Sequence, residues 1–480
     1  MGNEPFGISR RSFIGAAGAA ALLAACGRSN NEEPAATPTS AGGGATGTTI
    51  GEPKETRFTE PATKLSGSMS ILLWSHFVPA HDQWFDPFVK DWAQRVGISV
   101  TVDHINNAEV PTRLASEIAA RSGHDIVQYI APLSQFEPSV LDLKDVNTEA
   151  ETRLGPQLDI CKKCSFNPKT GKYYAFAPAW APDPGNFRKS LWDKVGMPNG
   201  PTNWDELLRG GTEIKAQGVQ MGIGMSQEID SNMAARALIW SFGGSIQDAE
   251  ENVVINSPET VEAVDYMARL FKATMTAEVF AWNAASNNQG LIAGNLSYIV
   301  NSISAWRTAQ DANPTVAEDI FFVPALKGPK AQLAAQHVLY NWVVPSHAKN
   351  PDAAKEFLLH YAGNLPQATY HSKLYDFPAF PRAVPQLDGW LANDPFSKTN
   401  PTKLSFLKIE DALKWSTNIG HPGPASTAVG EVFNTFVIPN MMARAARGEQ
   451  SARDSVAQAE REVKQIYDKW RQRGLVGGSR

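Results

Sequence analysis

Two of the three cysteines form a CxxC pair, Cys161-Lys162-Lys163-Cys164. Such a pair can do redox chemistry, and the neighbouring lysines would favour the reactive thiolates. A zinc site would need two more ligands, and the sequence has no second cysteine pair and no HExxH among its nine histidines. In an oxidising compartment the thiols would instead form a local disulfide, which is the interpretation we favour. We expect no metal site.

Other catalytic signatures are missing from the sequence, which contains no GxSxG, no P-loop and no complete dinucleotide fingerprint. Its 49 acidic residues leave a glycosidase carboxylate pair open, although no spacing singles one out. The 44 basic residues leave a net charge of −5, without the basic excess of a nucleic-acid binder. We therefore expect neither a bound cofactor nor a nucleic-acid partner.

Residues 1–26 have the features of an export signal. Arg10 and Arg11 precede an uncharged run, residues 13–25, which is too short to span a bilayer. The arginine pair is typical of the twin-arginine route. Cys26 follows Leu-Ala-Ala and resembles the cysteine of a bacterial lipobox, so we expect it to carry a lipid anchor. An ordinary signal with an unrelated cysteine is the alternative.

The next segment, residues 27–67, is rich in Gly, Pro, Ser, Thr and Ala and has almost no large apolar side chains. Such a composition cannot repay the cost of ordering, which predicts a disordered tether. The remaining residues, 68–480, hold enough hydrophobic and aromatic side chains for a packed body. We therefore expect an exported protein that is held at the cell membrane and faces the periplasm or the cell exterior.

The body begins with alternating strand and helix patterns. Short apolar or β-branched runs at 69–74, 98–102 and 125–129 predict strands, and the stretches between them have helical spacing. Strand–helix alternation of this kind predicts an α/β fold with a parallel sheet. Further along, polar residues that precede a helical pattern predict helix starts near Asn203, Ser257, Asn350 and Ser451.

Seven segments of the body match the motifs of one family, in family order. They are residues 74–76, 122–127, 170–178, 186–196, 202–207, 290–301 and 350–361. Each motif is weak alone, and in the second of them His124 stands where proline is more usual. On these segments the body resembles the extracellular solute-binding proteins of ABC importers, in the carbohydrate-binding group similar to maltose-binding protein.

The resemblance implies a two-lobed periplasmic-binding-protein fold with a hinge and an interlobe cleft. The first lobe would comprise residues 68–180 and 305–378, and the second would comprise residues 181–304 and 379–480. The chain would cross between the lobes near 177–184, 298–304 and 377–385. A protein of this family would be a monomer that meets its ligand in the cleft and then the membrane subunits of an importer.

A sugar cleft needs aromatic side chains for the C–H faces of the ring and planar polar groups for the hydroxyls. Given the resemblance, residues that follow predicted strands or lie at the crossings are candidates, because ligands bind at the carboxyl ends of strands in open α/β sheets. Trp240 and Trp282 are weaker, since core packing explains a tryptophan equally well. The candidates are Trp74, His76, Gln128, Tyr129, Trp180, Asp183, Trp240, Trp282, Asn301 and Trp306.

The favoured function is a non-catalytic lipoprotein that captures a carbohydrate and delivers it to an ABC importer. A secreted glycoside-acting enzyme would share the abundance of tryptophan. A binding protein for a charged solute is the third alternative, although a cation binder would be expected to gather carboxylates near Trp74 or Tyr129, and the sequence does not place them there.

Overall fold

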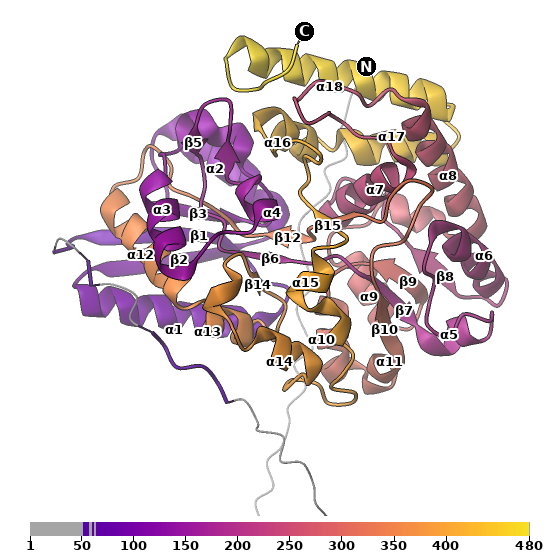
Figure 1. Cartoon of the computed structure of the whole chain (residues 1–480), viewed down its shortest axis with the longest axis horizontal. Helices are drawn as coiled ribbons and strands as arrows, with labels where there is room; N and C mark the ends of the chain where they lie inside the picture. The colour runs from indigo at the N-terminus through magenta and orange to yellow at the C-terminus, as the bar shows by residue number, and fades with distance from the viewer. Residues whose placement is uncertain (1–50, 57–59, 62–63, 480) are drawn as a thin grey trace, which may run out of the picture. The chain divides into compact units, whose positions relative to one another are not determined.

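The computed structural model describes residues 51–56, 60–61 and 64–479. The predicted signal, with Cys26, and residues 27–50 of the predicted tether lie outside the described residues. Within the described part of the chain, no helix is both long enough and apolar enough to cross a membrane. Two four-stranded sheets organise the described residues, and we call the parts built on them the first lobe and the second lobe (Figure 1).

The first lobe has the strand order β13-β3-β1-β2. Its parallel strands are β1 (Ser68–Trp74), β2 (Ser99–Ile105) and β3 (Ile126–Tyr129), which confirms the three predicted strands. The antiparallel β13 (Asn341–Val343) comes from a distant part of the chain and pairs with β3. The helices of this lobe are α1 (Pro79–Val96), α2 (Val110–Ala120), α3 (Lys144–Leu154), α4 (Asp159–Lys162), α12 (Pro351–Gly363) and α13 (Leu365–His371).

The second lobe has the strand order β10-β7-β9-β8. Its strands are β7 (Gly185–Arg188), β8 (Gln220–Gly222), β9 (Leu296–Val300) and β10 (Ile320–Val323). Its helices are α5 (Lys189–Asp193), α6 (Trp204–Lys215), α7 (Ile229–Phe242), α8 (Pro258–Thr274), α9 (Ser286–Ile292), α10 (Ser304–Ala312) and α11 (Pro314–Asp319).

The position of β10 corrects a predicted boundary. Residues 305–378 were expected in the first lobe, but β10 pairs antiparallel with β7 of the second sheet. The Arg188 guanidinium also donates to the Asp319 carboxylate over 2.6 Å, which fixes the start of β10 beside the end of β7. The chain therefore returns to the first lobe only after residue 323.

A small antiparallel sheet lies between the lobes, with β6 (Ala179–Ala181) at its centre, β12 (Val338–Leu339) on one side and β14 (Phe377–Pro378) on the other (Figure 1). We call it the crossing sheet. Two predicted crossings, near 177–184 and 377–385, contain strands of this sheet. The third predicted crossing, 298–304, instead belongs to β9 and the start of α10 in the second lobe. The remaining strand of the crossing sheet is β12.

Polar side chains begin the helices where the sequence predicts. The Asn203 side chain accepts from the N–H of Glu206 at the start of α6, and Ser257 does the same for Thr260 at α8. Asn350 caps α12 in this way, and Ser451 caps α18 (Ala452–Gln472). Such caps satisfy N–H groups that have no partner within the helix, typically stabilising it by about 1 kcal/mol.

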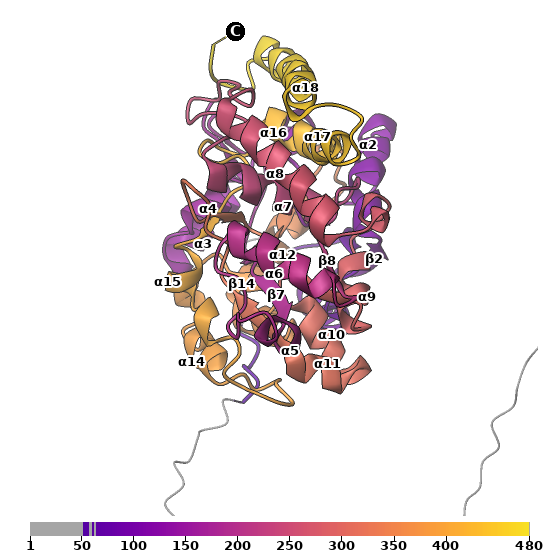
Figure 2. The same cartoon turned by 90° about the vertical axis from the view of Figure 1, so that its right-hand side faces the viewer.

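The C-terminal part of the chain connects the two lobes. Helix α16 (Thr427–Asn434) packs on the short helix η2 (Ser134–Ser139) of the first lobe, where Ser134 Oγ donates to the Ser426 carbonyl over 2.8 Å. Helices α17 (Val437–Ala446) and α18 pack against α8 of the second lobe (Figure 2). Helices α14 (Leu387–Ala392) and α15 (Ile409–Ala412) precede them in sequence.

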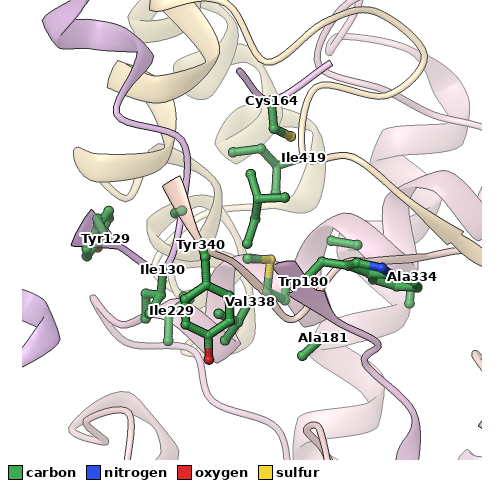
Figure 3. Close-up of a cluster of buried hydrophobic side chains, with 14 of the residues drawn as sticks. Tyr129, Ile130, Cys164, Trp180, Ala181, Ile229, Ala334, Val338, Tyr340 and Ile419 are labelled. Carbon is green, nitrogen blue, oxygen red and sulfur yellow. The ribbon is translucent and has the colours of Figure 1, made fainter. Parts of the chain in front are cut away.

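One hydrophobic core runs through the crossing sheet. Trp180 of β6 is fully buried, and Tyr340, beyond β12, is buried beside it. Figure 3 shows these side chains among residues of both lobes, with Ile130 from the first and Ile229 from the second. Because the core is continuous here, the crossing segments are packed protein and not a free linker.

The cysteine pair is buried and not bonded in the structure, so the predicted disulfide is wrong for this state. Cys161 lies in α4, and Cys164 Sγ accepts a hydrogen bond from Gln336 Nε2 over 3.2 Å. Burial raises the pKa of Cys164 to about 12 and that of Cys161 well above its ordinary value. Both residues therefore behave as small core side chains with unreactive thiols.

Part of the predicted tether contacts the first lobe. The Asn364 side chain accepts from the Thr56 N–H over 2.6 Å and donates to the Thr56 carbonyl over 2.7 Å. Gln367 Nε2 donates to the Pro53 carbonyl, and Glu52 pairs with His371 over 3.0 Å. Residues 51–56 are therefore docked on the first lobe, because their backbone groups find partners in α13 and at the junction of α12 and α13.

Candidate functional site

A cavity of about 350 Å³ lies between the two lobes. The first lobe contributes Ser75, Phe77, Asn106, Asn107, Ala108 and Tyr129. The second lobe contributes Gln227, Glu228, Ile229, Trp282, Asn283, Ala284 and Ala285, and α16 and the turn after it contribute Phe433 and Phe436. Its walls thus come from three distant parts of the sequence.

The first-lobe wall follows from the parallel sheet. Ser75 and Phe77 come directly after β1, Asn106 follows β2, and Tyr129 ends β3. Because parallel strands end at the same edge of a sheet, these residues converge there. The side-chain oxygen of Asn106, Oδ1, accepts from the Ala108 N–H over 3.0 Å, which holds the loop in a tight turn.

The second-lobe wall is held by the start of α7. The Glu228 carboxylate caps this helix, accepting from the N–H groups of Asp230 over 2.6 Å and Ser231 over 2.5 Å. A carboxylate is favourable there because the N-terminus of a helix carries partial positive charge. Burial nevertheless raises the pKa of Glu228, and the nearby Asp230 carboxylate raises it further.

Trp282 is fixed by its neighbours on both sides. Its carbonyl accepts from Ser226 Oγ over 2.7 Å. Its ring lies so close to Gly222 that a Cβ there would come within 2.4 Å of the ring. Trp282 is half-buried, and together with Gln227 it also lines a second cavity of about 540 Å³ that includes Arg444 and Arg447. The indole therefore forms part of the wall of both cavities.

The third wall is built by two phenylalanines near the junction of α16 and α17. Phe433 is buried under the guanidinium of Arg236, which lies 5.1 Å from the centre of the ring. Phe436 precedes α17 with a left-handed backbone, φ +56°. Such a conformation costs free energy in a residue with a bulky side chain, and it is often found at functional sites.

The lining chemistry suits a neutral polar ligand with apolar faces. Aromatic rings come from all three walls, and amide side chains stand beside them. Amides both donate and accept, so they can pair with hydroxyls, while aromatic faces pack on C–H patches. The described lining residues include one carboxylate and no lysine, arginine or histidine.

Of the predicted binding residues, Tyr129 and Trp282 line this cavity. The others do not line it, and their side chains are buried: Trp74, His76, Gln128, Trp180, Asp183, Trp240, Asn301 and Trp306. After β1 the difference is a single position, because Ser75 and Phe77 face the cavity whereas Trp74 and His76 face the core. Side chains in extended chain alternate between faces, and the sequence did not show which set points inward.

His337, Asp183 and Asp230 form a buried charged group at the crossing sheet. His337 Nδ1 lies 3.0 Å from Asp183 Oδ1, and its Nε2 lies 3.7 Å from Asp230 Oδ1. Burial opposes the charged form of His337, but the two carboxylates outweigh burial and raise its pKa. Asp183 thus helps to join the crossing to the first turn of α7.

The remaining predicted residues have packing roles. The Arg307 guanidinium lies over the Trp306 ring, with its Cζ 4.7 Å from the centre of that ring. The same ring packs edge-on to Phe322. Trp180 packs edge-on to Phe377 within the crossing sheet. Trp240 meets the His421 ring, Asn301 donates to Asn288 Oδ1 over 2.5 Å, and Gln128 of β3 is buried opposite Trp342 of β13.

Several lining residues were missed by sequence reasoning. Asn106 and Asn107 follow the predicted second strand, so the argument from strand ends could have found them. Gln227 and Glu228 lie at the start of α7, where Glu228 is the cap residue, and no sequence motif singles them out. For Phe433 and Phe436 the sequence carries no local signal, because only tertiary packing brings α16 to this cavity.

A family model described as "Bacterial extracellular solute-binding protein" matches residues 79–364. A binding protein of Brucella abortus is 24% identical over 191 residues, which are 39% of this chain and 46% of the relative. The chain thus matches less than half the length of that relative. A Deinococcus radiodurans protein described as an ABC transporter-binding protein is 25% identical over 276 residues, covering 52% of this chain and 66% of the relative.

Solved structures share the fold. The laminaribiose-bound sugar transporter protein of Arthrobacter chlorophenolicus is 17% identical, with a TM-score of 0.69 over 83% of this chain and 99% of that one. The maltose-bound MalE3 of T. maritima is 19% identical, with a TM-score of 0.68 over 83% and 100%. An ABC substrate-binding protein of Listeria monocytogenes in complex with cycloalternan is 15% identical, with a TM-score of 0.67 over 83% and 98%.

These solved structures establish the fold class predicted from the sequence. The family model spans more than half of the chain and includes β2, β3, the crossing strands β6 and β12, and the entire second sheet. The chain therefore belongs to the family of bacterial extracellular solute-binding proteins.

Proposed function

We propose that this protein captures a neutral mono- or oligosaccharide in the cavity between its lobes and delivers it to the membrane subunits of an ABC importer. The observation that carries the proposal is the wall chemistry, because aromatic rings and amides surround the cavity and its described lining has no basic side chain. An anionic solute would leave its charge unpaired there, whereas sugar hydroxyls can be satisfied by amides. The sugars bound to the structural neighbours support the same ligand class.

We also propose that the protein works as an exported lipoprotein. The twin-arginine pair Arg10-Arg11 and the lipobox-like Cys26 support this proposal. A monomer suffices, because all three walls of the cavity come from one chain. Substitution of Cys26 by Ser should release the protein from the membrane fraction, and retention of the variant there would contradict the anchor.

The direct test is a thermal-shift screen of the purified protein against neutral sugars, with an organic anion and a polyamine as comparison solutes. A ligand at 100 times its Kd should stabilise the folded state by about 2.7 kcal/mol. We expect stabilisation by at least one neutral sugar and by neither charged solute. Stabilisation by the anion or the polyamine alone would reject the sugar assignment.

Binding at this cavity is tested with Trp282→Ala. Loss of a stacking tryptophan should weaken sugar binding by about 2 kcal/mol, or roughly thirtyfold in Kd. Trp84→Ala is the matched control, because Trp84 is half-buried against Phe88 in the first lobe and does not line the cavity. Equal affinity losses in both variants would locate the sugar elsewhere.

Catalysis is tested in the same samples. A non-catalytic binding protein should return the bound oligosaccharide intact after long incubation. Cleavage products that vanish in Glu228→Gln would instead indicate a glycoside-acting enzyme, because Glu228 is the carboxylate among the described lining residues.

A further inference from the structure

Two histidines and an aspartate meet near the crossing sheet. His76 follows β1, His81 lies in the first turn of α1, and Asp376 directly precedes β14. One ligand-type atom from each of the three lies within 4.8 Å of the other two. Their exposed fractions are 6%, 3% and 0%, so water does not solvate the group.

Two atoms in this group face each other at a separation longer than a hydrogen bond. Asp376 Oδ2 and His81 Nε2 are 3.7 Å apart, and neither has a hydrogen-bond partner among the described residues. The Asp82 carboxylate lies 3.4 Å from His81 Nδ1 and favours the tautomer with its proton on Nδ1. With the proton on Nδ1, His81 Nε2 would direct a lone pair at a carboxylate oxygen, an arrangement that a cation between the two atoms would stabilise in this buried site.

His76 can join such a cation. Its Nε2 lies 2.7 Å from the Tyr340 hydroxyl oxygen and 3.2 Å from Asp376 Oδ1, so a metal ion bound here would replace the contact with Tyr340. Its Nδ1 lies 3.0 Å from the Val78 carbonyl oxygen and 2.8 Å from the Val78 nitrogen, so the backbone offers a partner to either tautomer. With the proton on Nδ1, the Nε2 lone pair is available as a metal ligand, held in place by a backbone carbonyl.

The spacing of these atoms suits a small transition-metal ion. Ligand atoms 2.0–2.1 Å from a tetrahedral zinc ion are about 3.3 Å from one another. The two N–O separations here are 3.2 and 3.7 Å, so small side-chain shifts would complete the geometry. Tyr340 donates to Asp376 Oδ1 and would orient the carboxylate. Within the described part of the chain, no lysine or arginine pairs with Asp376.

We propose that His76, His81 and Asp376 bind a divalent transition-metal ion, with zinc the best match to two imidazoles and a carboxylate. The ion would join the end of β1 and the start of α1 to the crossing strand β14. Ser75 and Phe77, on either side of His76, line the cavity. The ion therefore acts as a structural link behind the first-lobe wall, and it does not require that the cavity ligand be a sugar.

The test uses the untagged full chain after removal of metal with a chelator. Cobalt(II) is the probe, because tetrahedral cobalt with nitrogen and oxygen ligands absorbs visible light. We expect one Co²⁺ per chain with a tetrahedral spectrum, displaced by one equivalent of Zn²⁺, and a higher melting temperature with Zn²⁺. Absence of a tetrahedral cobalt spectrum in the wild-type protein would overturn the proposal, whether or not any variant folds.

Variants identify the ligands. His81→Gln and Asp376→Asn should each weaken Co²⁺ binding at least tenfold. His124→Gln is the matched control, because His124 is equally buried in the first lobe and pairs with Glu117 and Asp103 through different nitrogens. It should keep wild-type affinity for Co²⁺. The assignment is wrong if His81→Gln keeps wild-type affinity for Co²⁺. It is also wrong if His124→Gln loses as much Co²⁺ affinity as His81→Gln does. No sugar enters the experiment, so its outcome is independent of the proposed function.

Discussion

The contact between Gly222 and Trp282 makes a glycine part of the cavity. A Cβ at Gly222 would come within 2.4 Å of the Trp282 ring and 2.8 Å of Leu296. We predict that Gly222→Ala displaces the indole and weakens sugar binding about tenfold, because the ring loses its stacking position. Isothermal titration with the best sugar of the screen measures the loss.

Gly290→Ala is the control for that variant. A Cβ at Gly290 would crowd the same Leu296, at 2.6 Å, without reaching Trp282. The two variants should lose similar melting temperature, and only Gly222→Ala should lose affinity. Equal affinity in both would mean that the Trp282 ring does not contact the ligand.

His360 gives the stability of the first lobe a pH dependence. It is buried in α12, stacked on Phe88 at 4.8 Å, and burial lowers its pKa to about 3, with Arg95 adding to the effect. Between pH 6.5 and 3 the unfolded chain therefore holds a proton that the folded chain lacks, so stability falls as pH decreases below 6.5. At pH 5 this single group costs up to about 2 kcal/mol.

Urea unfolding of wild type and His360→Phe at pH 7 and pH 5 checks this sign. The phenylalanine keeps the stack on Phe88 but cannot be protonated. The wild type should lose up to about 2 kcal/mol more than the variant on acidification. A loss of equal size in both proteins would show that His360 does not contribute to the acid sensitivity.

At the residue scale, sequence reasoning found which strand ends matter and missed which side chains face the cavity. Tyr129 was found because it ends a strand, whereas Trp74 and His76 are one position away from the lining residues Ser75 and Phe77. Four to seven residues of strand do not reveal which face meets solvent when both faces are apolar, as in β1. Tertiary packing therefore decides which of these side chains point to the cavity and which point to the core.

At the scale of elements, the segment 51–56 offers a test of docking against disorder. Its Thr56 backbone exchanges two hydrogen bonds with the Asn364 side chain. We predict that Asn364→Ala releases this segment, because these bonds satisfy its backbone where few apolar contacts hold it. Hydrogen exchange at residues 51–56 should become much faster, while strands β1 to β3 stay protected.

Gln367→Ala is the milder comparison, since Gln367 makes one bond of 3.2 Å to the Pro53 carbonyl. It should accelerate exchange less than Asn364→Ala does. Fast exchange in the wild-type segment itself would argue for the tether that the composition predicts.

Elements with local signals were predicted, and elements defined by distant pairing were not. Periodicity and caps located β1 to β3 and the starts of α6, α8, α12 and α18. By contrast, β10 and β12 are short strands, and each pairs with a strand more than 130 residues earlier in the chain. These distant pairings determine which sheet each strand joins. Their assignment decides the lobe boundary, which is why the predicted boundary at 305 was wrong.

At the scale of the molecule, α16 is the element that joins the lobes beside the cavity. It packs on η2 of the first lobe, and Asn434 Nδ2 donates to Gln135 Oε1 over 3.1 Å. The same helix presents Phe433 to the cavity and contacts α18. One helix therefore contributes both to the cavity wall and to the contact with the first lobe.

A ligand that touches walls from both lobes binds the closed form better than the open form, so it shifts the population toward closure. We predict that small-angle scattering shows a smaller radius of gyration for the sugar-saturated protein than for the free protein. A solute that fails the thermal-shift screen serves as the control and should leave the radius unchanged.

The α16–η2 contact supplies the variant that separates closure from simple occupancy. A Cβ at Gly430 would come within 2.4 Å of Ser134 Oγ and 3.2 Å of the Gln135 nitrogen, so Gly430→Val should wedge η2 away from α16. Because Gly430 does not line the cavity, the variant should still contact sugar but bind it more weakly, and its radius should contract less on saturation. Full contraction with wild-type affinity in Gly430→Val would show that closure does not depend on this contact, and an unchanged radius in the wild type would reject ligand-driven closure itself.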